Sequence, residues 1–161
     1  MITETLLFLI KNFSYLGIFL TGAIATSTIL IPFPIDIAIF FTPALGLHPL
    51  LVSIAAGTGA AVGELTGYYI GVGGSTIKTV RKSRVAKFFI KFFNKAGFIT
   101  LLVAAFIPFP FDILGILAGV SKYDVKKFLL ATVIGKTLKA LVITYTGYFL
   151  LPYVGLFISR L

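Results

Sequence analysis

Five ionisable residues interrupt stretches of this chain that are otherwise apolar, and their types suit proton exchange and anion binding. They are Asp36, Glu64, Asp112, Lys136 and Lys139. Each costs about 2.5–3.5 kcal/mol when it faces hydrocarbon, so exposing all five costs on the order of 15 kcal/mol. We therefore expect them to share an interior cavity. Three acids against two lysines leave one negative charge in excess, which makes proton exchange by one acid a hypothesis, and the lysines supply positive potential for an anionic head group.

These residues also have purely structural interpretations. Asp36 and Asp112 each follow a Pro-Phe-Pro motif and fall in the first turn of an expected helix, where a carboxylate is favoured by the helix dipole and by unpaired backbone N–H groups. Lys136 and Lys139 have long side chains that can extend toward the membrane surface. Both interpretations stay open at the level of sequence.

Composition places these residues in a membrane protein. The 161 residues are 58% hydrophobic and 12% charged, with a mean hydropathy of +1.08, whereas about 25% charge is usual in a soluble domain. The fourteen Lys and Arg are clustered, since none lies between residues 12 and 77. This pattern predicts a single all-α integral membrane domain over residues 1–161 and argues against nucleic-acid binding.

Other composition features limit the chemistry. The chain has no cysteine and one histidine, His48, so we expect no metal site, no cofactor and no enzymatic activity. The first thirteen residues lack the positive start and cleavage site of a signal peptide, so we expect them to remain in the mature protein.

The chain contains an internal duplication. IPFPIDI at residues 31–37 and IPFPFDI at residues 107–113 are identical at six of seven positions. A short apolar segment and then a longer one follow each copy, and the longer ones end in Gly-Tyr-aromatic at Gly67 and Gly147. We therefore divide the chain into repeat 1 (about 14–73), a basic amphipathic linker (74–96) and repeat 2 (about 97–150).

The two proline motifs predict breaks at mid-membrane. Pro32, Pro34, Pro108 and Pro110 remove backbone donors and clash with the preceding turn. The arms around the second break, 98–107 and 111–120, have ten residues each, about 15 Å as helix, or half of a ~30 Å hydrocarbon layer. The expected fold is an inverted-topology repeat of a re-entrant helical hairpin plus a transmembrane helix. Two kinked but continuous transmembrane helices are the alternative.

Charge distribution sets the expected orientation. Basic residues are concentrated in segment 78–95 and again just after residue 120. The positive-inside rule then places this end in the cytoplasm, in a multi-pass protein of the cytoplasmic membrane. The segment 79–95 also alternates aromatic and basic residues, which favours an interfacial amphipathic helix over a solvated loop.

Smaller patterns predict helix packing and helix ends. Gly59, Gly63, Gly67 and Gly71 recur every fourth residue, which allows close approach of another helix. Glu64 lies near the middle of the same expected helix and should point into the bundle. Residues 121–124 are typical of a capping box that opens the last helix, and residues 94–97 are typical of a helix end.

Several of these motifs together resemble the DedA family, also called the VTT or SNARE-associated Golgi protein domain. The resemblance is carried mainly by Pro32, Phe33, Pro34 and Asp36, by Val62, Gly63 and Glu64, by Val133, Ile134 and Gly135, and by Gly147, Tyr148 and Phe149. It implies two facing re-entrant loops and movement of phospholipids or polyprenyl phosphate carriers between leaflets, with dependence on the proton-motive force.

This chain departs from the family pattern at charged positions. An acid usual before the first break falls near Ala25, and two arginines around the second break fall at Ala105 and Phe111, so those roles are not transferred. Asp36 and Glu64 match family acids. Asp112, Lys136 and Lys139 are particular to this sequence, and the lysines either replace the lost arginines or mark a divergent member.

The sequence thus predicts a flippase or scramblase for phosphate-bearing lipids. Lys136 and Lys139 would hold the head group, and Asp36, Glu64 and Asp112 would handle protons. The expected partners are membrane lipids and protons, with further copies of this chain left open. A proton-coupled exporter of small hydrophobic solutes and a non-transporting membrane scaffold are the alternatives.

Overall fold

A computed structural model of the chain describes residues 2–27, 35–74, 84–107 and 111–158. Within these ranges the protein is all-helical and contains no strand, which confirms the all-α part of the predicted fold class. The elements are α1 (Ile2–Ser27), α2 (Ile35–Phe41), the 3-10 helix η1 (Thr42–Leu45), α3 (Pro49–Gly74), α5 (Arg84–Phe106), α6 (Phe111–Val120) and α7 (Val125–Ile158).

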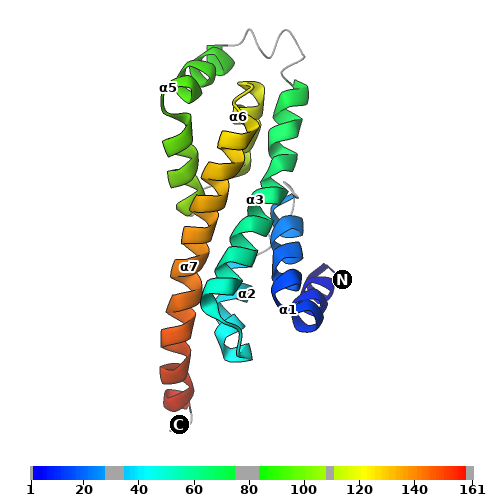
Figure 1. Ribbon diagram of the computed structural model, residues 1–161, viewed down its shortest axis with the longest axis vertical. Coiled ribbons are helices and arrows are strands. Elements are labelled where there is room, and N and C mark those ends of the chain that lie inside the picture. Colours follow the sequence, from blue (N-terminus) through cyan, green and yellow to red (C-terminus); the bar gives the residue numbers. More distant parts are fainter. Residues whose placement is uncertain (1, 28–34, 75–83, 108–110, 159–161) are drawn as a thin grey trace.

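Among the residues that the structure describes, two helices are long and apolar enough to cross a membrane. They are α3, with 26 residues, and the segment Val125–Tyr153 of α7, with 29 residues. The two helices pack against each other through the middle of the molecule (Figure 1). The hydroxyl groups of Ser53 and Thr144 lie 2.7 Å apart across this contact.

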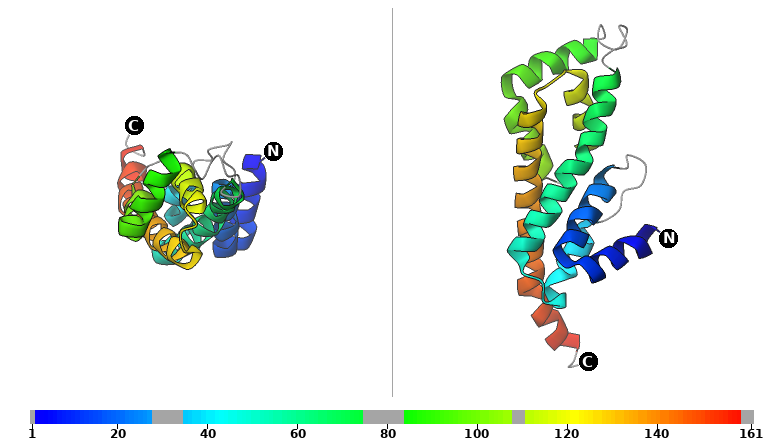
Figure 2. Two further views of the ribbon diagram at one scale, coloured as in Figure 1. Left: turned by 90° about the horizontal axis from the view of Figure 1, so that it is seen from above. Right: turned by 45° about the vertical axis from the view of Figure 1, so that its right-hand side comes forward.

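The shorter helices gather at the two ends of this pair. α1 and α2 lie beside one end, and α5 and α6 lie beside the other (Figure 1). α1 is kinked at Ser14, where φ is 47° and ψ is −115°, and its first residues point away from the bundle (Figure 2). α5 also changes direction along its length (Figure 2). The arms 15–27 and 98–106 can therefore lie along the bundle while the segments before them turn aside.

The packing between the two halves is reciprocal. α1 packs on α3 and α5 packs on α7, so the first arm of each half contacts the long helix of its own half. The returning helices cross over, since α2 packs on α7 and α6 packs on α3. A Cβ on Gly147 would overlap the Phe40 carbonyl oxygen, and one on Gly71 would overlap that of Ile116. Phe40 and Ile116 each lie four residues after the aspartate of their motif.

The regularly spaced glycines of α3, Gly59, Gly63, Gly67 and Gly71, face two different helices. Gly59 and Gly63 lie against the backbone of α1, next to the carbonyl oxygens of Phe19 and Ala23. Gly71 lies against α6, while a Cβ on Gly67 would meet the Asp112 carbonyl oxygen only at 3.7 Å. One helix face therefore holds both α1 and α6 close to α3, because glycine has no side chain to keep them apart.

Apolar side chains follow the same division into two ends. One cluster centres on Leu101, Phe111 and Phe128, between α5, α6 and α7, and the other on Ile18 and Val52, between α1 and α3. Many large apolar residues remain on the outside, among them Ile99, Ile113 and Val142. An outer surface of this kind suits a hydrocarbon environment.

Two predicted helix ends are wrong in detail. Asp124, not Ser121, caps α7, because its Oδ1 accepts the Lys127 backbone N–H at 2.8 Å. The Ser121 hydroxyl is buried without a partner among the described residues. The helix end predicted at residues 94–97 is also wrong, because α5 runs through them: apolar packing of Phe93 and Leu101 on either side outweighs the local stop signal. The four proline breaks lie outside the described residues.

Candidate functional site

The α7 helix brings a lysine to the buried face of α3. Lys136 Nζ lies 2.7 Å from Glu64 Oε1, and the two side chains are 15% and 3% exposed. Glu64 thus points into the bundle, where charged groups need partners because water is excluded. Its second carboxylate oxygen, Oε2, is buried and has no hydrogen-bond partner among the described residues.

An aromatic ring covers the same lysine from a third helix. Lys136 Nζ lies 5.0 Å from the centroid of the Phe111 ring, within the range of a cation–π interaction. Phe111 begins α6 and is buried beside Phe128. Its role was not apparent from the sequence, where it stands at a position usual for a family arginine. The adjacent Asp112 and the depth of Lys136 were the available signals.

One turn further along α7, Lys139 forms the second ion pair. Its Nζ lies 2.5 Å from Oδ2 of Asp36, in the first turn of α2. Here the side chains are 23% and 45% exposed, so this pair is far more open than the first. Asp36 is thus engaged with a base, although its position is also that of a helix-capping residue.

Two spaces adjoin these lysines. A small internal cavity of about 40 Å³ touches Asp36, Lys136 and Lys139, and it has room for about one water molecule. A lateral groove of about 290 Å³ is lined by Asp36, Lys139, Phe106, Val142 and Ile143. Phe106 and Val142 belong to the exposed outer surface. The Asp36–Lys139 pair therefore lies between an inner cavity and a groove that opens sideways.

The third predicted acid is placed differently. Asp112 lies in the first turn of α6, and within the described ranges it forms no ion pair. Three of the five ionisable residues, Asp36, Lys136 and Lys139, line the small cavity together. Four of the five form two ion pairs along α7, and Asp112 stands beside the first pair through its neighbour Phe111.

A glycine outside the predicted stripe also shapes the site. Gly57 faces Thr137, and a Cβ there would overlap the Thr137 side chain and backbone. Gly57 lies seven residues before Glu64, hence on the same side of α3, and Thr137 follows Lys136. The close approach at Gly57 thus sets the distance at which α7 presents its lysines. The spacing to Glu64 was the signal for this role.

No metal centre is evident in the part of the chain that the structure describes, because no three His, Asp or Glu residues gather there. His48 is exposed in the turn before α3, where its backbone N–H donates to the Tyr15 hydroxyl at 3.1 Å.

The long apolar helices, the apolar outer surface and the ion pairs between helices define a helical membrane protein. The sequence profile of the VTT domain matches residues 31–149, so the chain belongs to the VTT domain family, also known as the DedA family. VTT family proteins are membrane proteins that are regarded as transporters or flippases rather than enzymes. The match begins at the first proline motif and ends at the last Gly-Tyr-aromatic motif.

An uncharacterized protein of Methanocaldococcus jannaschii is 27% identical over 153 residues, which cover 94% of this chain and 91% of that protein. No solved structure matches the chain significantly.

Proposed function

We propose that this protein moves phosphate-bearing lipids between the leaflets of a membrane. The observation that carries the proposal is the Asp36–Lys139 ion pair at the base of a lateral apolar groove. A lipid needs a polar contact for its head group and an apolar wall for its chains, and this groove offers both. Lys139 supplies the cation, while Phe106 and Val142 supply the wall.

The sizes of the two spaces indicate where the head group binds. The inner cavity of about 40 Å³ is too small for a phosphate with its ester groups, whereas the groove of about 290 Å³ accommodates them. The head group therefore binds at Lys139 first, and Lys136 becomes available only when the cavity widens. Asp36 is displaced from the Lys139 ammonium as the phosphate arrives.

Proton coupling has a simple basis in this arrangement. The Asp36 carboxylate and the phosphate compete for the same Lys139 ammonium group. When Asp36 takes up a proton it loses its charge and releases Lys139 to the phosphate, and when the phosphate leaves, Asp36 gives up the proton and pairs again. Glu64 and Asp112 are proposed as further proton-handling acids next to Lys136.

The reciprocal helix packing supports the proposed membrane topology. In this topology each short-helix pair is a re-entrant hairpin, and the two hairpins enter from opposite faces as an inverted repeat. The crossing contacts of α2 with α7 and of α6 with α3 are what such a repeat requires. We place the end that carries α6 and the start of α7 in the cytoplasm because basic residues are concentrated there.

A vesicle assay tests the proposal. The purified chain is reconstituted with a fluorescent phosphatidylglycerol, and leaflet exchange is followed by quenching of the outer leaflet. We expect exchange by the wild type, exchange near the protein-free rate for Lys139→Gln, and partial exchange for Lys139→Arg, which retains the charge. Lys126→Gln, an exposed lysine of the same helix, is the matched control. Undiminished exchange by Lys139→Gln would overturn the site, and no exchange by the wild type would overturn the function.

The apolar wall of the groove favours one second candidate, a proton-coupled exporter of small hydrophobic solutes. Apart from Asp36 and Lys139, the residues that line the groove are Phe106, Val142 and Ile143. The same vesicles separate the candidates, because an exporter moves a trapped hydrophobic solute down an imposed pH gradient without moving the labelled lipid.

A further inference from the structure

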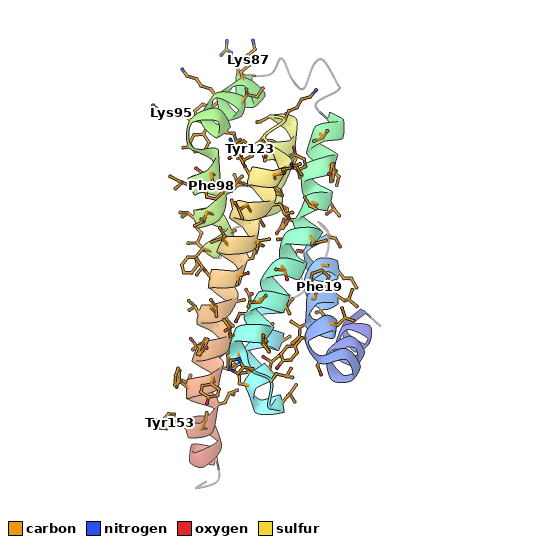
Figure 3. All side chains as sticks on the ribbon, viewed as in Figure 1. Phe19, Lys87, Lys95, Phe98, Tyr123 and Tyr153 are labelled. Atoms are coloured by element: carbon orange, nitrogen blue, oxygen red, sulfur yellow. The ribbon has the colours of Figure 1, made fainter. Side chains whose placement is uncertain are left out.

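A second, larger cavity lies far from the ion pairs, at the basic end of the molecule. It has a volume of about 570 Å³ and lies between α5 and the turn from α6 to α7. Its lining includes Lys95, Lys122 and Lys127, and a single acid, Asp124. Figure 3 shows Lys95, Phe98 and Tyr123 of this lining toward the same end as Lys87.

The charges in this cavity favour an anion. Asp124 is already engaged, because its Oδ1 accepts the Lys127 backbone N–H as the cap of α7. Within the described ranges, none of the three lysines lies within ion-pair distance of a carboxylate. The positive end of the α7 dipole also points here. Three ammonium groups against one carboxylate leave a net positive charge around this space, as is typical of sites for lipid phosphates.

The cavity is built from fixed backbone and ring contacts. Lys122 has a left-handed backbone with φ of 53°, and the Tyr68 hydroxyl donates to the Tyr123 carbonyl at 2.5 Å, which ties this turn to α3. The rings of Phe93 and Tyr123 approach to 5.6 Å between centroids. A Cβ on Gly97 would come within 2.9 Å of both rings, so this glycine permits their approach.

Tyr123 adds a neutral hydrogen-bond donor to the lining. Burial, and secondarily the nearby charge of Asp124, raise the pKa of its phenol above the ordinary value. The hydroxyl therefore keeps its proton at neutral pH and above.

An apolar stripe leads from this cavity along the outside of α5. Ile99, which lines the cavity, is 68% exposed, and Val103 and Phe106 follow on the same helix face with 48% and 40% exposed. The stripe spans about 10 Å along the helix axis. Phe106 at its far end also lines the lateral groove at Lys139. A free anion gains nothing from contact with this apolar stripe, whereas an acyl chain can pack against it.

We propose that this cavity is a binding site for the phosphate head group of an anionic lipid, with one acyl chain along Ile99, Val103 and Phe106. The three lysines contact the phosphate and Tyr123 donates a hydrogen bond to it. The head-group site shares no lining residue with the Asp36–Lys139 groove, which the acyl-chain stripe reaches only at Phe106, and it does not depend on lipid movement between leaflets.

Lipid binding by the full chain in detergent tests this site without any membrane surface. The probes are phosphatidylglycerol and phosphatidylcholine, titrated and counted by native mass spectrometry. We compare Lys95→Gln, Lys122→Gln and Lys127→Gln combined in one variant with a matched variant that combines Lys87→Gln, Lys91→Gln and Lys126→Gln. All three control lysines are exposed and outside the cavity lining. Circular dichroism checks that both variants keep the wild-type helix content.

We expect the wild type to prefer phosphatidylglycerol, and the cavity variant to bind it about tenfold or more weakly, since each lysine near a lipid phosphate contributes roughly a factor of five. The control should change by less than about twofold. Equal losses in both variants would overturn the site in favour of general charge attraction. Lys139→Gln removes the groove site only and should keep the lipid that depends on Lys95, Lys122 and Lys127, so failure here and failure of the proposed transport are separate results.

Two further arms distinguish a lipid from a free anion. Inorganic phosphate should displace bound phosphatidylglycerol poorly. Val103→Ser should weaken the binding of phosphatidylglycerol without changing the weak binding of inorganic phosphate. If inorganic phosphate displaces the lipid fully at equal concentration, or if Val103→Ser has no effect on the lipid, the acyl-chain part of the proposal is overturned.

Discussion

The two ion pairs of α7 are made of the same groups, a lysine and a carboxylate, and lie one helical turn apart. Lys136–Glu64 joins two long helices and is nearly enclosed, with Glu64 3% exposed. Lys139–Asp36 joins α7 to the short helix α2 and faces a groove, with Asp36 45% exposed. The difference between them lies in the partner helix and in access, not in the chemistry of the ions.

This difference assigns separate tasks to the two pairs. Breaking a buried pair leaves an uncompensated charge away from water, which strongly destabilises a protein. Breaking an exposed pair costs little, because solvent or a ligand replaces the missing partner. The inner pair therefore fixes the packing of α3 on α7, and the outer pair can exchange its carboxylate for a phosphate.

Removing the charge of Glu64 should produce the largest effect on stability. In Glu64→Gln the Lys136 ammonium stays buried without a counter-charge, and we expect a loss of about 3–5 kcal/mol in the free energy of unfolding. The measurement is a titration with SDS in mixed micelles, followed by circular dichroism.

A double variant sharpens this prediction. Glu64→Leu combined with Lys136→Met removes both charges, and we expect it to recover most of the stability lost in Glu64→Gln, because a buried pair replaced by apolar groups is often neutral. A loss below about 1 kcal/mol in Glu64→Gln would contradict the comparison, since it would make the inner pair equivalent to a surface pair.

Gly57→Ala should have an intermediate effect, because it forces the two long helices apart. The new Cβ would overlap the backbone of Thr137, and overpacking of this kind costs about 1–3 kcal/mol. Gly73→Ala is the matched control, since nothing lies within 4 Å of a Cβ there. Alanine at that helical position should leave the free energy of unfolding unchanged or raise it by up to about 1 kcal/mol.

Coupling between variants tests which ion pair depends on Gly57. The effects of Gly57→Ala and Glu64→Gln should not be additive, because both disturb the same contact of α3 with α7. Those of Gly57→Ala and Asp36→Asn should add, since α2 packs on α7 and moves with it. The opposite pattern of coupling would reverse the assignment of the two pairs.

The positions of several helices could be predicted from the sequence because the signals for a helix are local. Membrane-length apolar stretches, the duplicated motif and the glycine spacing predict α3, α6 and α7, and α6 begins and ends at the predicted residues 111 and 120. The glycine positions also indicated where backbones approach closely. Local signals were less reliable at helix ends, where Asp124 replaces Ser121 as the cap of α7.

The pairing of charges could not be predicted because it depends on which helices become neighbours. Five charges in apolar segments predict burial but not partners, so one shared chamber was the simplest hypothesis. The pairing follows from the crossing of α2 onto α7 and of α6 onto α3. This crossing brings Asp36 to Lys139 and places Phe111, rather than Asp112, over Lys136. Such long-range contacts leave no pattern in a single sequence.

Neutralising Asp36 should have the smallest effect on stability. In Asp36→Asn we expect the free energy of unfolding to stay within about 1 kcal/mol of the wild type, since both Lys139 and residue 36 keep access to the groove. The same SDS titration used for Glu64→Gln measures it. In vesicles the Lys139 ammonium of this variant should be available to the phosphate lipid at every pH, because no carboxylate competes for it, so exchange should lose its dependence on pH. Asp124→Asn, which removes a carboxylate outside the groove, is the control and should keep the wild-type pH profile.

If Asp36→Asn destabilises the protein as strongly as Glu64→Gln does, the outer pair is a structural contact like the inner one, and the groove has no free cation to offer a lipid. If it is stable and its exchange still varies with pH as in the wild type, the proton resides elsewhere, with Glu64 and Asp112 the remaining acids on the inner side of α7.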